Sequence, residues 1–208
     1  MPFNITFKSP FGMLISGPSQ SGKTTWVYNL LKEKHKLTEP APTTVLLFYE
    51  EYQPLYGRML QEKLITKAIE GVPTYDIIKQ TIKEYQEESS GHCLAIFDDA
   101  SQSLQHLEPL FKVGSHHLKT SAIVLTQMLF GETSHLRVMT ANCAYQVLLK
   151  TIRGQYQVRT LASQLSTSQA SFIVNSYLSS TKTPYSYLVI DLKPEQSDVV
   201  RLRSRLFE

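Results

Sequence analysis

Residues 17–24 read Gly-Pro-Ser-Gln-Ser-Gly-Lys-Thr, so two glycines stand at fixed distances from a Lys-Thr pair. The apolar run 13–15 precedes this segment, and apolar residues at helical spacing, Trp26, Leu30 and Leu31, follow it. Glycines here let the backbone curl until successive N–H groups point at bound phosphates, and the following helix adds the positive end of its dipole. The order strand, glycine loop, helix therefore predicts a phosphate-binding loop for a nucleoside triphosphate.

Further apolar runs of strand length alternate with stretches whose apolar residues recur at helical spacing. The expected strands are residues 44–49, 94–97 and 122–125, with two more at 145–149 and 185–190, and a half-buried strand at 3–7. The expected helices lie around residues 77–85 and 104–111, and the polar segment between the last two strands has room for one or two more. Such alternation predicts an α/β fold in three layers, with a mainly parallel central sheet flanked by helices.

Length and composition favour one domain over residues 1–208. A chain of 208 residues, 42% of them hydrophobic, can bury a sizeable core without disulfides or metals. Both cysteines, Cys93 and Cys143, lie in apolar surroundings, which favours buried thiols and a reducing compartment. No apolar run approaches the roughly 18 residues of a membrane span, and no secretory signal stands at the N-terminus. We expect a protein that stays inside a cell or a particle, without a membrane partner.

The charge is distributed unevenly along the chain. Residues 1–136 carry 12 Lys and Arg against 14 Asp and Glu, whereas residues 137–208 carry 9 against 4. The last third is therefore basic, which is compatible with a polyanion contacting it. Arg201, Arg203 and Arg205 alternate with other residues near the C-terminus. They would line a path for a polyanion or belong to a solvated strand edge.

A second chemical signal follows the apolar run 94–97, which ends in Asp98 and Asp99. The carboxyl end of a parallel strand lies at the same sheet edge as the phosphate loop. Asp98 is then placed to bind Mg²⁺, through a water, and Asp99 to polarise the water that attacks the γ-phosphate. The alternative is that the two carboxylates only cap the next helix.

Polar and basic residues beyond these carboxylates extend the candidate site. Thr126 and Gln127 end the strand 122–125, where Gln127 would sense the γ-phosphate or orient the water, unless it is an ordinary polar strand end. In the additional-strand class of P-loop ATPases a strand lies between the two that carry the site, and we expect residues 44–49 to form it. A neighbouring subunit often supplies an arginine in phosphoryl transfer. The candidates, of which we favour the second and third, are Arg58, Arg137, Arg153 and Arg159.

The histidine pair His116 and His117, with Lys119, precedes the strand 122–125. Adjacent histidines point in different directions and no third ligand is near in sequence, which argues against a metal site. Contact with DNA or with a neighbouring subunit is the other interpretation.

Taken together, several segments resemble the genome-packaging ATPases of Polinton/Maverick elements and related double-stranded DNA viruses, within the FtsK-HerA superfamily. The resemblance covers nearly the whole chain and is carried by residues 17–24, 48–56, 96–99, 114–117, 126–130 and 191–194. It implies a P-loop fold of the additional-strand (ASCE) type and a homo-oligomeric ring, a pentamer or hexamer, that moves double-stranded DNA into a capsid with energy from Mg-ATP. A capsid or portal vertex is a further expected partner.

The resemblance also assigns roles residue by residue. Catalytic roles fall to Lys23, Asp98, Asp99 and Gln127, with Arg137 and Arg153 as candidate arginines. Metal ligation falls to Thr24 and Asp98. The nucleotide-binding residues are Gly17, Pro18, Ser19, Gln20, Ser21, Gly22, Lys23, Thr24 and Thr25. Many relatives have glutamate where this chain has Asp99, whose side chain is one methylene shorter.

Three other functions are compatible with the same motifs. A small P-loop kinase would use Arg153 and Arg159 in a lid and would need no DNA. An ATP-dependent switch or loader would bind DNA with slow turnover and no translocation. A nucleotide-stabilised assembly factor would keep its assembly after Lys23→Ala even though ATP hydrolysis is lost.

Overall fold

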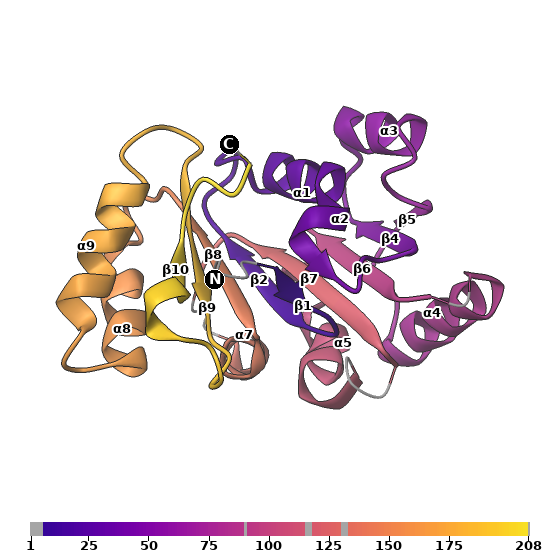
Figure 1. Cartoon of the computed structure of the whole chain (residues 1–208). Coiled ribbons are helices and arrows are strands. Elements are labelled where there is room, and N and C mark those ends of the chain that lie inside the picture. Colours follow the sequence, from indigo (N-terminus) through magenta and orange to yellow (C-terminus); the bar gives the residue numbers. More distant parts are fainter. Residues whose placement is uncertain (1–5, 90, 115–117, 130–132, 208) are drawn as a thin grey trace.

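The computed structural model describes residues 6–89, 91–114, 118–129 and 133–207. Its main feature is a sheet of eight strands flanked by helices on both faces (Figure 1). In the order in which they lie side by side, the strands are β10 (Leu202–Arg203), β9 (Tyr187–Asp191), β8 (Tyr145–Leu149), β2 (Gly12–Ser16), β7 (Thr120–Thr126), β6 (Cys93–Asp98), β4 (Thr44–Tyr49) and β5 (Lys67–Glu70). Two short strands, β1 (Phe7–Lys8) and β3 (Thr38–Glu39), pair separately.

The helices alternate with the strands along the chain, as expected. They are α1 (Lys23–Lys32), α2 (Lys34–Leu37), α3 (Pro54–Gln61), α4 (Tyr75–Ser89), α5 (Leu104–Pro109), α7 (Ser134–Asn142), α8 (Gln155–Leu165) and α9 (Ala170–Ser180). A π-helical turn, η1 (Leu110–Gly114), extends α5, and a 3-10 turn, η2 (Asp198–Val200), precedes β10. None of the helices in the described part of the chain is long and apolar enough to cross a membrane.

The sheet is mainly parallel, which confirms the predicted fold class. All neighbouring pairs from β5 to β8 are parallel, and only β9 runs antiparallel to its two neighbours. A strand does lie between β2 and β6, but it is β7, not residues 44–49 as we expected. β4 pairs with the far side of β6, from Thr44↔Cys93 to Tyr49↔Asp98. The chain after β6 returns through α5 and η1 to fill the gap beside β2.

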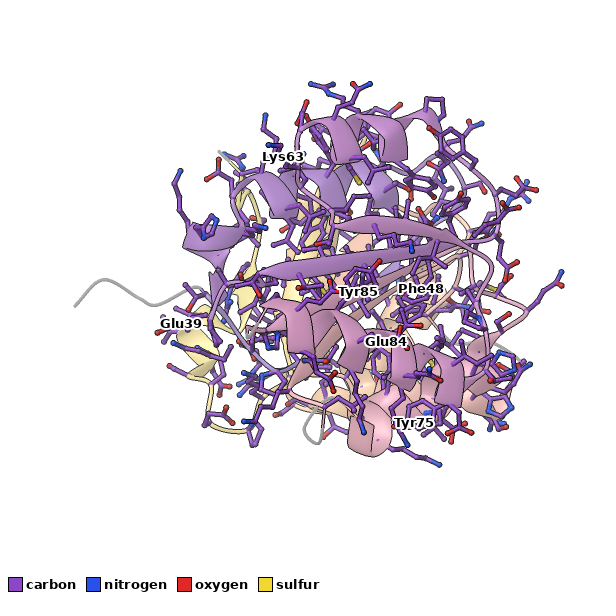
Figure 2. All side chains as sticks on the ribbon, turned by 90° about the vertical axis from the view of Figure 1, so that its right-hand side faces the viewer. Glu39, Phe48, Lys63, Tyr75, Glu84 and Tyr85 are labelled. Atoms are coloured by element: carbon purple, nitrogen blue, oxygen red, sulfur yellow. The ribbon has the colours of Figure 1, made fainter. Side chains whose placement is uncertain are left out.

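Two layers of side chains cover the sheet. On one face, α1 and α3 bury Trp26, Leu30 and Tyr56 against the odd-numbered residues of β2, such as Met13 and Ile15. The other face carries α4, α5 and α7 over one half and α8 and α9 over the half formed by β8 and β9. Figure 2 looks at the β5 edge and shows Lys63, just after α3, and Tyr85 of α4 on opposite sides of the sheet.

Two of the three C-terminal arginines form bonds within the domain. Arg203 is buried and forms an ion pair with the buried carboxylate of Asp191. Arg201 donates to the backbone carbonyls of Asp191, Lys193 and Gln196. Both guanidinium groups are therefore engaged within the domain. The buried Arg203 cannot line a surface path for a polyanion, whereas for the partly exposed Arg201 this role stays a prediction. Arg205 remains exposed.

The strand ends differ from expectation at two places. Tyr185, placed in the last long strand, lies before it with a left-handed φ of 64°, and β9 begins at Tyr187. Of the half-buried strand predicted at 3–7, only Phe7 belongs to a described strand, since residues 3–5 lie outside the described residues. His116 and His117 also lie outside them.

Candidate active site

Residues 17–22 form a tight loop between β2 and α1, as the motif predicts. Gln20 and Gly22 have left-handed φ values of 61° and 95°, which turn the backbone back on itself. At Gly17 a Cβ atom would lie 2.6 Å from Ser21 Oγ and 2.9 Å from Leu149 Cβ, so only glycine fits. The loop closes through the Ser21 N–H, which donates to the Pro18 carbonyl over 3.2 Å.

Two polar side chains of this loop fit an anionic ligand. Lys23 Nζ donates to the carbonyl oxygens of Gly17 (2.8 Å) and Pro18 (3.0 Å), which holds the ammonium over the loop. Burial lowers the pKa of Lys23, and the carboxylates of Asp98 and Asp99 partly oppose this shift. Ser21 Oγ is buried and has no hydrogen-bond partner among the described residues. A phosphate group would satisfy both the orphan hydroxyl and the lysine.

Asp98 is the last residue of β6 and points to the face that α1 and α3 cover. It is only 3% exposed, and its Oδ2 accepts hydrogen bonds from Thr24 Oγ1 and Tyr56 OH, each 2.8 Å long. Burial raises the pKa of Asp98, whereas the two hydroxyl donors and Lys23 lower it. The pairing of Thr24 with Asp98 brings together the two residues predicted to bind the metal.

The oxygen donors at this point fit Mg²⁺ in the way that nucleotide-dependent enzymes hold it. Mg²⁺ usually takes one or two protein oxygens and completes its shell with phosphates and waters. The hydroxyl of Thr24 and the carboxylate of Asp98 are such a pair. Within the described ranges, no group of three or more His, Cys, Asp and Glu side chains could hold a metal without a ligand. The site therefore suits a cation that arrives with a nucleotide.

Asp99 directly follows β6 and is exposed, unlike Asp98. Its φ of 59° lies in the left-handed region, where aspartate and asparagine are enriched over other non-glycine residues. This backbone turn directs consecutive carboxylates to different surroundings, one buried and one solvent-accessible. Such a division suits a fixed metal ligand beside a proton acceptor.

Gln127 and Arg153 border the same hollow next to the phosphate loop. This hollow of about 480 Å³ is also lined by Ser16, Gly17 and Pro18. Gln127 follows β7, which pairs with β2 so that Ser16 faces Thr126, and both hydroxyl groups lie 3.0 Å apart. The strand order thus brings Gln127 to the loop from one side and Arg153, after β8, from the other.

The four candidate arginines lie in different parts of the structure. Arg153 also lines a second hollow, of about 520 Å³, on the outer side of the phosphate loop. Arg137 lies on α7 in a different hollow, with Cys143 and Gln146 near the start of β8. Arg58 on α3 pairs with Glu62, and Arg159 is exposed on α8. Only Arg153 of these four lines a described cavity together with the loop of its own chain.

Tyr56 is a member of the site that the sequence argument did not single out by role. It is 0% exposed, yet its hydroxyl reaches Asp98 from α3, 42 residues away in sequence. Burial, followed by the nearby charge of Asp98, raises the pKa of Tyr56. The only sequence signal was its place within residues 48–56, a segment that carried the family resemblance without a stated reason.

Comparison with known proteins identifies the family to which these site residues belong. The family model described as Poxvirus A32 protein matches residues 3–148, well over half of the 208-residue chain. The chain belongs to the poxvirus A32 family. Membership confirms the resemblance to viral genome-packaging ATPases. The matched range ends within β8, so it includes the phosphate loop, both aspartates and Gln127 but not Arg153.

Solved structures support the fold of this A32-family chain. The genome packaging NTPase B204 from Sulfolobus turreted icosahedral virus 2, solved in complex with ATP-gammaS, has a TM-score of 0.63 at 12% identity, covering 94% of this chain and 96% of that one. The cytoplasmic domain of the type VII secretion ATPase EccC from Thermomonospora curvata has a TM-score of 0.58 at 14% identity. It covers 88% of this chain, which spans 24% of that one. No curated protein was matched.

Proposed function

We propose that this chain is an ATP-driven motor that packages double-stranded DNA into viral capsids as a ring of identical subunits. The observation that carries the proposal is the pairing of Thr24 with Asp98 beside the phosphate loop, in a chain of the A32 family. This geometry supports hydrolysis of Mg-ATP. We place the protein in the infected cell, with a capsid or portal vertex as a further partner.

Each residue of the site has a defined part in the proposed hydrolysis. The loop N–H groups and Lys23 would bind and orient the phosphates, and Thr24 with Asp98 would hold Mg²⁺, which neutralises phosphate charge when bound. Asp99 accepts a proton from the attacking water, and Gln127 orients that water from the end of β7. The chain therefore contributes positioning and electrostatic stabilisation, which carry most of the catalysis in phosphoryl transfer.

The exposed residues after β4 and after β8 differ in charge, which supports a head-to-tail ring. Glu50, Glu51 and Tyr52 are exposed after β4, whereas Ile152 and Arg153 are exposed after β8. Figure 1 shows α3 and β5 at one end of the molecule and α8 and α9 at the other. Contacts between two different patches of identical subunits are heterologous, and they close into a ring when the rotation allows it.

The first experiment measures ATP hydrolysis by the purified chain with and without linear duplex DNA, together with its mass in solution in the presence of a non-hydrolysable ATP analogue. We expect DNA to stimulate turnover and the nucleotide-bound protein to have the mass of a pentamer or hexamer. DNA binding with slow, unstimulated turnover would favour a switch or loader. Turnover by a monomer that ignores DNA would contradict a motor that acts alone.

The arginines can be assigned to their own or to a neighbour's site. Arg153→Ala is expected to lower kcat by about a thousandfold, the lower end of the effect of arginine fingers. Because Arg153 borders its own loop, mixing this variant with Lys23→Ala subunits should restore no activity. Arg137→Ala should be rescued by the same mixing, because Arg137 lines neither hollow beside its own loop and would act on a neighbour's site.

The measurement is steady-state phosphate release by mixed rings at several subunit ratios. Rescue of Arg153→Ala would move this arginine to the neighbour's site. If both alanine variants keep full activity in the assembled ring, neither arginine meets the transition-state charge.

A further inference from the structure

One oxygen of Asp98 accepts hydrogen bonds from hydroxyl groups on two different helices. Thr24 of α1 and Tyr56 of α3 both donate to Oδ2 over 2.8 Å. The carboxylate is buried, and a buried charge needs such donors to remain fixed and satisfied. Thr24 belongs to the phosphate-binding motif, whereas Tyr56 lines neither of the two hollows beside the loop.

The ring of Tyr56 is held in place by two other tyrosines. Its centroid lies 5.1 Å from the ring of Tyr49 and 5.9 Å from that of Tyr52, and the second pair is edge-to-face. The backbone N–H of Tyr56 donates to the Gln53 carbonyl, within the first turn of α3, where Pro54 starts the helix. A rigid aromatic side chain with a fixed hydroxyl is suited to orient its partner.

The same helix is also fastened to α1, the helix that follows the phosphate loop. Tyr28 OH of α1 donates to both carboxylate oxygens of Glu62, 2.8 Å and 3.1 Å away, just after α3. Arg58 of α3 binds Glu62 and lies 5.1 Å from the ring centroid of Tyr28. α3 therefore connects the phosphate-loop helix to the carboxylate at the end of β6.

We propose that Tyr56 is a positioning residue that holds Asp98 Oδ2 toward Thr24, so that both oxygen ligands of Mg²⁺ are aligned before the nucleotide binds. This role rests on the proposed Mg-ATP chemistry of the site. Tyr56 lies on α3, outside the phosphate-binding motif, so its hydrogen bond orients Asp98 from a different helix than the bond from Thr24 does. Without it, a single bond from Thr24 would set the direction of a buried carboxylate.

The test compares Tyr56→Phe with Tyr49→Phe, which makes the same change in the same aromatic cluster. Tyr49 pairs with Asp98 through the sheet backbone, but among the described residues its hydroxyl makes no hydrogen bond to that carboxylate. Binding of a fluorescent N-methylanthraniloyl ADP is measured in EDTA and in a MgCl₂ titration, with kcat, KM and thermal unfolding of each variant. In EDTA both variants should bind within about twofold of the unmodified protein. With Mg²⁺, Tyr56→Phe should lose about tenfold in affinity, which corresponds to one hydrogen bond to a charged group.

The kinetic constants of Tyr56→Phe and Tyr49→Phe should differ in a way that a loss of packing alone does not explain. We expect kcat of Tyr56→Phe to fall at least about tenfold, as for a lost charged hydrogen bond, with Tyr49→Phe close to the unmodified protein. A Tyr56→Phe protein that responds to Mg²⁺ as Tyr49→Phe does would overturn the role of Tyr56. So would weaker binding already in EDTA together with early unfolding, because the hydroxyl would then serve the fold. If the unmodified protein shows no response to Mg²⁺, the proposed Mg-ATP chemistry fails first.

Discussion

Replacement of Lys23 by alanine is expected to reduce ATP hydrolysis by about a thousandfold while the domain stays folded. Within the described residues the ammonium donates to the backbone carbonyls of Gly17 and Pro18, and without it the buried carboxylate of Asp98 keeps its hydrogen bonds from Thr24 and Tyr56. Its loss withdraws the cation that would meet the phosphates, an effect comparable to removing a preorganised transition-state donor. Phosphate release at saturating ATP measures the activity, and circular dichroism with thermal unfolding checks the fold.

Lys32→Ala is the matched control, because Lys32 lies on the same helix, is exposed, and ends α1 far from the loop. It should keep unmodified activity. A Lys23→Ala protein with normal turnover would mean that ATP is hydrolysed elsewhere. If Lys23→Ala loses hydrolysis but assembles as the unmodified protein does, the result would agree with a nucleotide-stabilised assembly factor.

Local patterns predicted the elements of the fold well, because the strands of a parallel sheet are buried on both faces and stand out as apolar runs. β4 and β8 occupy the predicted residues, 44–49 and 145–149. The helix α3 and the strand β5 were not predicted. In α3 only Tyr56 and Met59 are buried, and β5 is an edge strand with no fully buried residue. Neither segment therefore shows a strong periodic pattern of apolar residues.

The spatial order of the strands could not be read from their order in the sequence. An apolar run such as residues 44–49 shows that a strand is buried, but it does not show which neighbour it pairs with. The sheet places β7 between β2 and β6, which brings Gln127 to the loop. It also places β8 beside β2, which brings Arg153 to the loop from the other side. Roles that depend on contacts between distant segments therefore required the structure.

Some parts of the site also follow from local sequence motifs, whereas others depend on contacts between distant segments. The phosphate loop and Asp98 follow from short motifs whose geometry is set by the adjacent strand and helix. The hydrogen bond between Tyr56 and Asp98 joins α3 to the end of β6, 42 residues away in sequence, and no local spacing predicts it. The left-handed conformation of Asp99 also appears only in the structure, and it bears on why aspartate stands at this position.

Asp99→Asn is expected to lower kcat by about 10²- to 10⁴-fold, the contribution of a general base, while nucleotide binding is preserved. Asparagine has the same shape and tolerates the left-handed φ of 59°, so this variant removes the charge without straining the turn. Single-turnover hydrolysis and filter binding of ATP should therefore show a protein that retains ATP without cleaving it.

Asp99→Glu separates the chemistry from the backbone conformation. Glutamate keeps the carboxylate but is less tolerant of a left-handed φ, which disfavours it by about 1 kcal/mol per residue. We expect partial ATPase activity, above that of Asp99→Asn, and a lower midpoint of thermal unfolding. This would explain why aspartate, although one methylene shorter than glutamate, stands at this position: the turn that separates the two carboxylates selects it. An Asp99→Asn protein that hydrolyses ATP at the unmodified rate would show that another group accepts the proton of the attacking water.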